Sequence, residues 1–404
     1  MSVKNLIAAA ALWLQATTLW ASVDKTDEWH IVADDFSNYN GVTLANGTIG
    51  IQTSDKLLEV GDVVLNNVYM SRRSGDVSRI ARGPQFLNLV IHIDGKTLTD
   101  SNVSHKRQVL DMKEAKMKMI FDADGAEISY EIMAMRNLPY MGLVRVRVKA
   151  KRDINIDVRN RTSFATEYVD CSADFKNLRD GSHIMPLMVS RAISYDRSVA
   201  VASATAFLFP TEEHPEIVSE DVVDGYPAMK FVTDLKKGQT LEFSLMGAVT
   251  NSIEFPNLDA DVERMAVYAL RSDPDTLVDG HKKEWERLWE SDIIIEGDAE
   301  SQRDVRLALY HLYSFGGEGT RNSIAPMGLS TVTGYNGHVF WDTEMWMYPP
   351  LLMLNQDMAR SCIDYRTDRL PQACRRARHY GFGGAMYPWE SDRSGDCLLY
   401  TSDA

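Results

Sequence analysis

The sequence predicts a multidomain protein that is β in its first part and α in its last part. Two observations support this fold class. From about residue 41 to residue 251 hydrophobic residues recur with a period of two, whereas past Pro256 they recur with a period of 3.6. The 404 residues, 45% hydrophobic and 25% charged, leave room for about two or three folded domains. We therefore expect a large antiparallel β-sandwich followed by helices.

The strand pattern is clearest where valines at 144, 146 and 148 alternate with arginine and lysine, and it returns at residues 153–159. Such alternation is typical of half-buried antiparallel strands. Turn-forming pairs separate several of the strand-like segments: Asp94-Gly95, Asp124-Gly125 and Lys237-Gly238. Because each pair favours a tight turn between neighbouring strands, we expect a hairpin at each of the three.

The first helix pattern places five large side chains on one face: Leu277, His281, Trp285, Leu288 and Trp289. We expect this amphipathic helix to begin near Pro274 and to end at Ser291, inside a linker that spans about residues 257–297. Three further helices are predicted after it, one marked by Leu309 and Leu312, one by Met358, Cys362 and Tyr365, and one between Pro371 and Gly381.

Charge and aromatic content narrow the class of partner. The chain has 43 Lys and Arg against 57 Asp and Glu, a net charge of −14, which repels phosphate backbones and anionic lipid surfaces. We therefore expect no nucleic acid as a partner. The 16 Tyr and 8 Trp suit a neutral, hydroxyl-rich partner such as a sugar, although aromatic residues are more often core.

Residues 1–21 have the three parts of a secretory signal: Lys4, the apolar run 6–14 and the small residue Ala21. Cleavage after Ala21 would leave a mature chain without a membrane span, because no other stretch approaches about 18 apolar residues. Export to the periplasm or the extracellular space follows. Trp13 and Trp20 keep a membrane anchor as the alternative for this segment.

The four cysteines, Cys171, Cys362, Cys374 and Cys397, have no spacing typical of a metal site, and no histidine lies at a ligand-like distance. We expect no metal and no cofactor. Cys362 and Cys374 fall on separate predicted helices, so we expect isolated thiols rather than a disulfide.

The segment 334–346, Gly-Tyr-Asn-Gly-His-Val-Phe-Trp-Asp-Thr-Glu-Met-Trp, crowds aromatic, acidic and imidazole groups into thirteen residues. Trp341 offers an apolar face to a sugar ring, and Asp342 accepts hydrogen bonds from paired hydroxyls, which together indicate a pyranose subsite. The alternative is a helix start, with Asp342 or Thr343 as the cap. For Trp346 we favour a place in the core, and for His338 a structural, hydrogen-bonded role over that of a general base.

A second segment, 384–391, Gly-Ala-Met-Tyr-Pro-Trp-Glu-Ser, again sets an aromatic residue beside a carboxylate, at Trp389 and Glu390. Two such loops suggest one shared cleft. Glycoside hydrolysis needs two carboxylates, one of them protonated, so Glu390 is also a candidate acid.

These two segments resemble glycoside hydrolase family 65, the maltose, trehalose and kojibiose phosphorylases and their hydrolytic relatives. The segment 46–50, Asn-Gly-Thr-Ile-Gly, is similar to the opening of that family's N-terminal domain, and residues 285–289 to its linker helix. The resemblance implies a β-supersandwich at 22–256, a helical linker at 257–297 and an (α/α)6 barrel from 298. It also implies that Trp341, Asp342, Trp389 and Glu390 line a glucose subsite, with Glu390 a sugar ligand rather than the acid.

Only about four helices fit between residues 298 and 404, so the resemblance implies an incomplete barrel with the general acid, a Glu, expected beyond residue 404. Residues 397–404 also depart from the family pattern. We expect the parent protein to be an exported inverting hydrolase of α-linked glucosyl di- or oligosaccharides, a homodimer when full length. A phosphorylase is the alternative, and for this chain alone a non-catalytic carbohydrate-binding protein.

Overall fold

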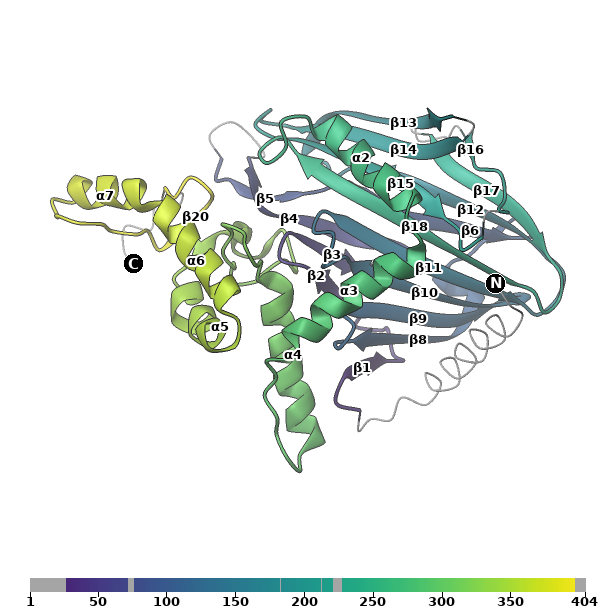
Figure 1. Ribbon diagram of the computed structural model, residues 1–404, viewed down its shortest axis with the longest axis horizontal. Coiled ribbons are helices and arrows are strands. Elements are labelled where there is room, and N and C mark those ends of the chain that lie inside the picture. Colours follow the sequence, from purple (N-terminus) through teal and green to yellow (C-terminus); the bar gives the residue numbers. More distant parts are fainter. Residues whose placement is uncertain (1–26, 72–75, 182, 212, 221–226, 397–404) are drawn as a thin grey trace.

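The computed structural model describes residues 27–71, 76–181, 183–211, 213–220 and 227–396. Within these residues the strands form one large sheet, two smaller sheets and one short ladder, and the helices from α5 onward lie at one end of the molecule (Figure 1). The large sheet has the order β1 (His30–Ala33), β8 (Val103–Asp111), β9 (Lys116–Ala123), β10 (Ala126–Ala134), β11 (Met141–Ala150), β18 (Thr240–Asn251), β15 (Ala200–Leu208), β14 (His183–Ser194) and β13 (Tyr168–Asp180).

The other sheets are smaller. The second sheet has the order β16 (Val218–Glu220), β17 (Ala228–Leu235), β12 (Ile154–Ser163), β6 (Gln85–Ile93) and β7 (Lys96–Thr97). The third has the order β2 (Thr43–Ala45), β3 (Ile49–Thr53), β4 (Val60–Met70) and β5 (Arg79–Arg82). The ladder joins β19 (Val339–Phe340) to β20 (Glu390–Ser391).

The turns explain how the chain passes between these strands. Asp94-Gly95 joins the antiparallel pair β6 and β7, and Asp124-Gly125 joins β9 and β10, which confirms both predicted hairpins. The hairpin predicted at Lys237-Gly238 is wrong. Gly238 does turn the chain with a left-handed φ of 87°, but β17 pairs with β12 in the second sheet while β18 pairs with β11 in the large sheet. The turn therefore connects two sheets.

Aromatic rings fill the space between the large sheet and the second sheet. Phe231 of β17 packs edge to face against Phe207 of β15, with ring centroids 5.0 Å apart, and against Phe243 of β18 at 5.1 Å. All three side chains are buried. This aromatic core is what a sandwich of two apolar sheet faces requires, and the predicted order of β before α is confirmed.

The helices follow the last long strand. They are α2 (Leu258–Leu270), α3 (Pro274–Leu288), α4 (Ala299–Phe315), α5 (Tyr348–Leu354), α6 (Gln356–Asp368) and α7 (Leu370–His379), with shorter helical turns η1 (Asp100–Asn102), η2 (Gly334–Gly337) and η3 (Thr343–Met347). The Asp273 side chain caps α3 by accepting a hydrogen bond from the Thr276 amide at 2.9 Å, so this helix begins where predicted. It ends at Leu288 rather than Ser291.

Helix α2 was not predicted as a separate element. Its buried residues Val262 and Ala266 pack on the outer face of the large sheet, against small residues that include Ala204 and Ala248. Those alanines let a helix lie close to the sheet, and this packing is the reason that the chain continues as a helix directly after β18.

The turn between β2 and β3 holds the end of α4. The Gly47 amide donates to the Ser314 carbonyl at 2.7 Å, and a Cβ on Gly47 would lie 2.5 Å from the Gly316 carbonyl oxygen, so only glycine fits. The Arg136 guanidinium donates to the carbonyls of Tyr313 and Gly316 at 2.8 and 3.1 Å. These contacts satisfy carbonyls at the helix end and fix where the next segment begins.

The predicted signal at 1–21 and the divergent segment Cys397–Ala404 lie outside the described residues. In the described part of the chain no helix is both long and apolar enough to cross a membrane. Cys171, Cys362 and Cys374 are thiols rather than disulfides there, as predicted, with Cys362 on α6 and Cys374 on α7. Burial raises the pKa of the Cys362 thiol to about 11.

Candidate functional site

The two motif segments predicted to share a cleft meet in the β19–β20 ladder. Val339 pairs with Ser391 and Phe340 pairs with Glu390 in antiparallel register. Continuing that register by one residue sets Trp341 opposite Trp389. The two predicted motif segments, about 50 residues apart in sequence, are therefore neighbours across one short piece of sheet.

The two indoles form a half-exposed pair. The ring centroids of Trp341 and Trp389 are 5.2 Å apart with an interplanar angle of 68°, and the side chains are 39% and 41% exposed. Phe340 packs edge to face against Trp389, with ring centroids 6.2 Å apart, and is itself buried. Large aromatic faces that stay open to solvent while their bases are packed are typical of ligand contact surfaces.

Unusual backbone geometry leads into the ladder. Tyr335, Asn336 and Gly337 have left-handed φ values of 51°, 53° and 68°. A Cβ on Gly337 would lie 2.4 Å from Cβ of Ile80, so this glycine is required both by conformation and by space. The chain therefore turns tightly at Gly337, just before β19. At Gly334 the requirement is space alone, because a Cβ there would lie 2.6 Å from the Met327 side chain.

Asp342 lies directly after the ladder, where the chain enters η3, a single π-helical turn. Its half-buried side chain does not cap that turn, so the structure does not support the helix-cap alternative for this residue. Thr343 is buried instead, and its hydroxyl donates to the Ile324 carbonyl at 2.5 Å. π-helical turns occur often at functional sites, and this one carries Asp342 at its start.

The core position predicted for Trp346 is wrong, because that side chain is 70% exposed. On this turn Thr343 is the residue that faces inward, which leaves Met345 and Trp346 on the outer side.

Glu344 is held by Arg366, which donates to its two carboxylate oxygens at 2.7 and 2.8 Å and to the Phe340 carbonyl at 2.9 Å. Burial lowers the pKa of Arg366, but the bonds to Glu344 outweigh it and raise that pKa above its ordinary value.

Glu390 and His338 form a buried pair. Glu390 is 2% exposed and His338 is fully buried, and the distance from His338 Nδ1 to Glu390 Oε2 is 3.1 Å. The other ring nitrogen, Nε2, lies 2.8 Å from the Ser78 carbonyl oxygen. His338 is thus hydrogen-bonded through both nitrogens, as the structural interpretation of this residue predicts.

Several residues that support the site were missed from the sequence. Ser78 and Tyr69 come from the sandwich, and the Tyr69 hydroxyl donates to the Gly337 carbonyl at 2.8 Å. Asp392 accepts from the Ser78 hydroxyl at 2.6 Å. The partners of Ser78 and Tyr69 lie more than two hundred residues further along the chain, and nothing in their local sequence marks these contacts.

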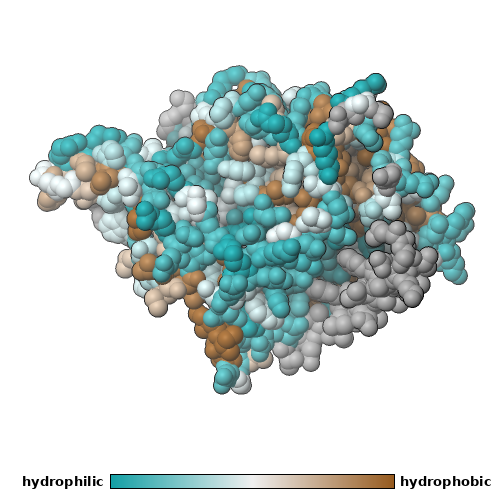
Figure 2. Space-filling view, in the orientation of Figure 1, coloured by the Kyte–Doolittle hydropathy of each residue, from teal (hydrophilic) through white to brown (hydrophobic). Residues whose placement is uncertain are grey.

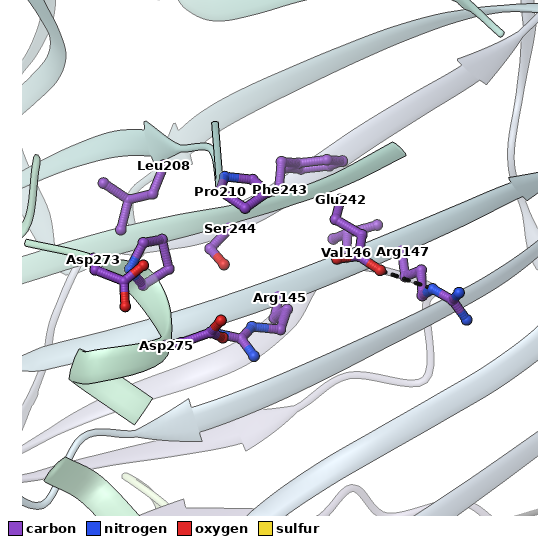
Figure 3. Close-up of a pocket in the computed structure, with 11 residues that line it drawn as sticks. Arg145, Val146, Arg147, Leu208, Pro210, Glu242, Phe243, Ser244, Asp273 and Asp275 are labelled. Atoms are coloured by element: carbon purple, nitrogen blue, oxygen red, sulfur yellow. Dashed lines mark hydrogen bonds and ion pairs between the residues drawn. The ribbon is translucent and has the colours of Figure 1, made fainter. Parts of the chain in front are cut away.

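A separate surface hollow lies on the sandwich, between β11, β18 and the start of α3 (Figure 3). Its charged side chains already have partners. Arg145 pairs with Asp275 at 2.8 Å, Arg147 pairs with Glu242 at 2.9 Å, and Asp273 caps α3. None of the predicted sugar-binding residues lines it. The two motif segments therefore lie away from this hollow, and the candidate site is the one at the β19–β20 ladder.

Comparison with known families matches both parts of the chain. The profile for the glycosyl hydrolase family 65 N-terminal domain matches residues 40–288, and the profile for the glycosyl hydrolase family 65 central catalytic domain matches residues 306–401. The first of these alone covers more than half of the 404 residues.

Two curated relatives share 37% identity with the chain. They are a kojibiose hydrolase of Flavobacterium johnsoniae, aligned over 91% of this chain and 55% of its own length, and a kojibiose hydrolase of Mucilaginibacter mallensis, aligned over 93% and 56%. A kojibiose phosphorylase of Halothermothrix orenii is 26% identical over 80% of this chain and 44% of its own length. The chain thus spans about half the length of the curated relatives it matches.

Among solved structures, one described as a kojibiose phosphorylase candidate from the human microbiome superposes with a TM-score of 0.76. The superposition covers 93% of this chain and 53% of the other protein's chain, with 17% sequence identity. At that identity the likeness concerns the fold alone.

Proposed function

Because this chain belongs to glycosyl hydrolase family 65, we propose that it supplies the sandwich and the glucose subsite of an exported, inverting hydrolase. The substrates are α-linked glucosyl di- or oligosaccharides, with kojibiose as the first to test. The observation that carries the proposal is the pair of half-exposed indoles, Trp341 and Trp389, set opposite each other with Asp342 and Glu390 next to them in the chain.

The chemistry of this cluster suits a glucose ring. The C–H faces of a pyranose are apolar and pack on indole rings, while its equatorial hydroxyls donate to carboxylate oxygens. Asp342 is half-buried beside Trp341, and Glu390 is fixed by His338 beside Trp389. A carboxylate in a partly dehydrated site binds a hydroxyl pair more strongly than one in bulk water, which gives the site orientation as well as affinity.

Glycoside hydrolysis with inversion requires a carboxylic acid that protonates the leaving oxygen and a carboxylate that activates water. Three carboxylates around the ladder, other than Asp342, already have partners: Glu390 contacts His338, Glu344 is held by Arg366, and Asp392 accepts from Ser78. We therefore assign sugar binding rather than proton transfer to Glu390, and we propose that these 404 residues alone do not turn over substrate.

Helices α4 to α7 are proposed as the first helices of an (α/α)6 barrel. Two facts support this. The central catalytic domain profile begins within α4, at residue 306, and the helices between β19 and β20 leave large apolar side chains exposed, among them Leu352, Met353 and Ile363. Figure 2 shows hydrophobic residues interrupting the hydrophilic surface over this helical part. Apolar helix faces of this kind are buried against neighbouring helices in a closed double ring.

Hydrolysis is favoured over phosphorolysis by two arguments. The relatives named as hydrolases share more identity with the chain, over more of its length, than the kojibiose phosphorylase of Halothermothrix orenii does. In addition, residues 1–21 have the pattern of an export signal. A sugar phosphate conserves bond energy only where it can enter metabolism, so an exported enzyme gains more from water as the nucleophile.

The test is product analysis with the full-length gene product, incubated with kojibiose and other α-linked glucobioses, with and without phosphate. We expect phosphate-independent release of glucose, first as the β-anomer by NMR, and none from the 404-residue chain. Phosphate-dependent formation of glucose 1-phosphate would identify a phosphorylase instead. Glucose binding by the full-length protein without any release would identify a carbohydrate-binding protein.

A further inference from the structure

The sandwich reaches into the sugar site through one short region. We define the β4–β5 platform as Asn67, Tyr69, Ser78 and Ile80, which lie on β4, on β5 or just before β5. It holds the chain just before β19 and just after β20. On one side the Tyr69 hydroxyl donates to the Gly337 carbonyl at 2.8 Å, and on the other the Ser78 hydroxyl donates to Asp392 at 2.6 Å.

His338 links this platform to Glu390. A carbonyl oxygen only accepts, so the 2.8 Å contact with Ser78 requires that His338 Nε2 carries a hydrogen. The opposite ring nitrogen then faces Glu390 Oε2 at 3.1 Å, with one proton between them. Because the imidazole is fully buried, the ring orientation that Ser78 sets is passed directly to the carboxylate.

Close packing removes freedom of movement between platform and ladder. Gly337 lies so close to Ile80 that even a methyl group would not fit between them, and the Tyr69 ring lies against the His338 ring with centroids 5.8 Å apart. At the other end of the platform, Arg369, which lies between α6 and α7, donates to the Asn67 side chain at 3.3 Å. Asp392 is buried as well, and its Oδ1 accepts from the Ser394 amide at 2.7 Å.

We propose that Tyr69 and Ser78 are positioning residues of the glucose subsite, which act on Glu390 through His338 and the ladder. The inference rests on the proposed function. The Ser78 carbonyl orients the imidazole, and the Ser78 hydroxyl holds that residue in place through Asp392. The imidazole in turn fixes Oε2 of Glu390, and a fixed Oε2 sets where the second carboxylate oxygen meets a sugar hydroxyl. Tyr69 holds Gly337, next to His338 and just before β19, the strand that leads to Trp341. The sandwich is thereby a working part of the sugar site, since displacements of about 1 Å in a bound geometry have large effects.

The first test observes the link itself. In the 404-residue chain labelled with 15N-histidine, we expect His338 to show a protonated Nε2, identified by its absence in the variant His338→Asn. We also expect the Nδ1 resonance to shift in Glu390→Gln while Nε2 keeps its hydrogen. A His338 that is protonated on Nδ1 alone, or whose Nδ1 resonance is indifferent to Glu390→Gln, would overturn the proposal whatever the sugar affinity.

The second test measures affinity for D-glucose by tryptophan fluorescence. We expect Tyr69→Phe, which removes the donor to the Gly337 carbonyl, to weaken binding about three- to tenfold. We expect the same of Ser78→Ala, which keeps the carbonyl that faces His338 but releases residue 78 from Asp392. Ser78→Thr, which keeps the hydroxyl, should bind like the wild type. Matched controls are Tyr39→Phe and Ser190→Ala. They remove hydroxyls bonded only within the sandwich, to Thr53 and Gln108 in one case and to Ser203 in the other. The controls should lower Tm at least as much as the test variants while leaving glucose affinity unchanged.

The two proposals fail in different ways. If Trp341→Phe abolishes the glucose response while Tyr69→Phe and Ser78→Ala bind within about 1.5-fold of the wild type, the glucose subsite stands and the positioning role is wrong. If glucose affinity falls in the controls as much as in the test variants, the effect is one of stability and the positioning role is again wrong. If the wild type gives no glucose response in either the 404-residue chain or the full-length protein, the proposed function fails and the positioning role fails with it.

Discussion

The sandwich and the helical part of this chain use large apolar side chains in opposite ways. In the sandwich, rings such as Phe207, Phe231 and Phe243 are buried between two sheets. In the helical part, large side chains remain exposed from residue 335 to residue 389, and Met353 is 83% exposed. The sandwich thus buries most of its large apolar side chains and leaves only some, such as Ile184 and Val232, exposed. The helical part instead presents apolar surface that a ligand or further chain would cover.

The exposed side chains of the helical part fall into two kinds. Trp341 and Trp389 face each other beside carboxylates at the ladder, as a ligand surface requires. Leu352 and Met353 lie on α5 and Ile363 lies on α6, outside the two motif segments that carry the carboxylates. At about 25 cal/mol per Å2, leaving several hundred Å2 of such surface wet forfeits on the order of 10 kcal/mol. That amount is comparable with the stability of a whole domain.

The largest expected effect is on the integrity of the two parts. Under limited proteolysis of the 404-residue chain we expect a resistant sandwich and rapid cleavage between residues 341 and 389. The sequence alone would end the resistant core near Gly297, but Tyr310 and Tyr313 of α4 are buried against the sandwich side, so the core should retain α4. Mass spectrometry of the fragments checks this. Equal resistance of α5 to α7 would contradict the comparison.

Substitutions in the two parts should differ in how much they lower the free energy of unfolding. Phe231→Ala removes a ring that packs on both Phe207 and Phe243, so we expect the free energy of unfolding of the sandwich to fall by about 3–5 kcal/mol. The matched change in the helical part, Met353→Ala, should alter it by less than about 0.5 kcal/mol. Denaturant unfolding followed by circular dichroism measures both. Similar losses for the two variants would show that the helical part is packed as tightly as the sandwich.

The stability of the contact between helix α3 and the sandwich should depend on pH. Burial, with smaller contributions from Arg136 and Lys116, lowers the pKa of His281 to about 4. Its Nδ1 accepts from the Arg136 amide at 3.0 Å and its Nε2 donates to the Glu114 carbonyl at 2.9 Å, so the ring is neutral.

Between pH 6.5 and pH 4 the unfolded chain therefore binds a proton at His281 that the folded chain does not, and stability falls as pH falls. The loss approaches about 3 kcal/mol at pH 4. His281→Asn, which keeps an acceptor for Arg136 but does not titrate, should lack this slope in unfolding free energy measured against pH. An identical slope in the variant would remove His281 as its cause.

The smallest effect in energy is the one closest to function. In the full-length parent, Asp342→Asn should lower kcat/KM for an α-linked glucobiose by about 10²-fold, the scale of a lost charge-assisted contact in a closed site. Asp304→Asn, an exposed change on α4, should leave it within about twofold. A loss of less than threefold at Asp342 would take this residue out of the glucose subsite.

The sequence predicted much of the fold because the two periodicities are local properties. Alternation along β11 and the apolar face of α3 follow directly from residues two or four apart, and the structure confirms both. Pairing between strands is not local. Lys237-Gly238 has the residues of a hairpin turn, yet β17 and β18 pair with other strands, because sheet partners are chosen by packing across the whole domain.

At the site, residue types could be predicted but their partners could not. The motifs named Trp341, Asp342, Trp389 and Glu390, while the register that sets the indoles opposite each other is a property of the folded ladder. Trp346 looked equally apolar in sequence and is exposed, since the π-helical turn directs Thr343 inward instead. The contact between His338 and Ser78 spans 260 residues and has no local sequence signal.

The central claim is that Trp341 and Trp389 belong to one glucose subsite while the indoles of the sandwich side do not. The most direct measurement is 19F NMR of the protein labelled with 5-fluorotryptophan and titrated with D-glucose, with each signal assigned by Trp→Phe substitution. We predict that the Trp341 and Trp389 signals shift together, with one shared dissociation constant, while those of the buried Trp285 and Trp289 stay unchanged. Shifts of Trp341 and Trp389 with different dissociation constants, or no shift of either, would contradict the claim.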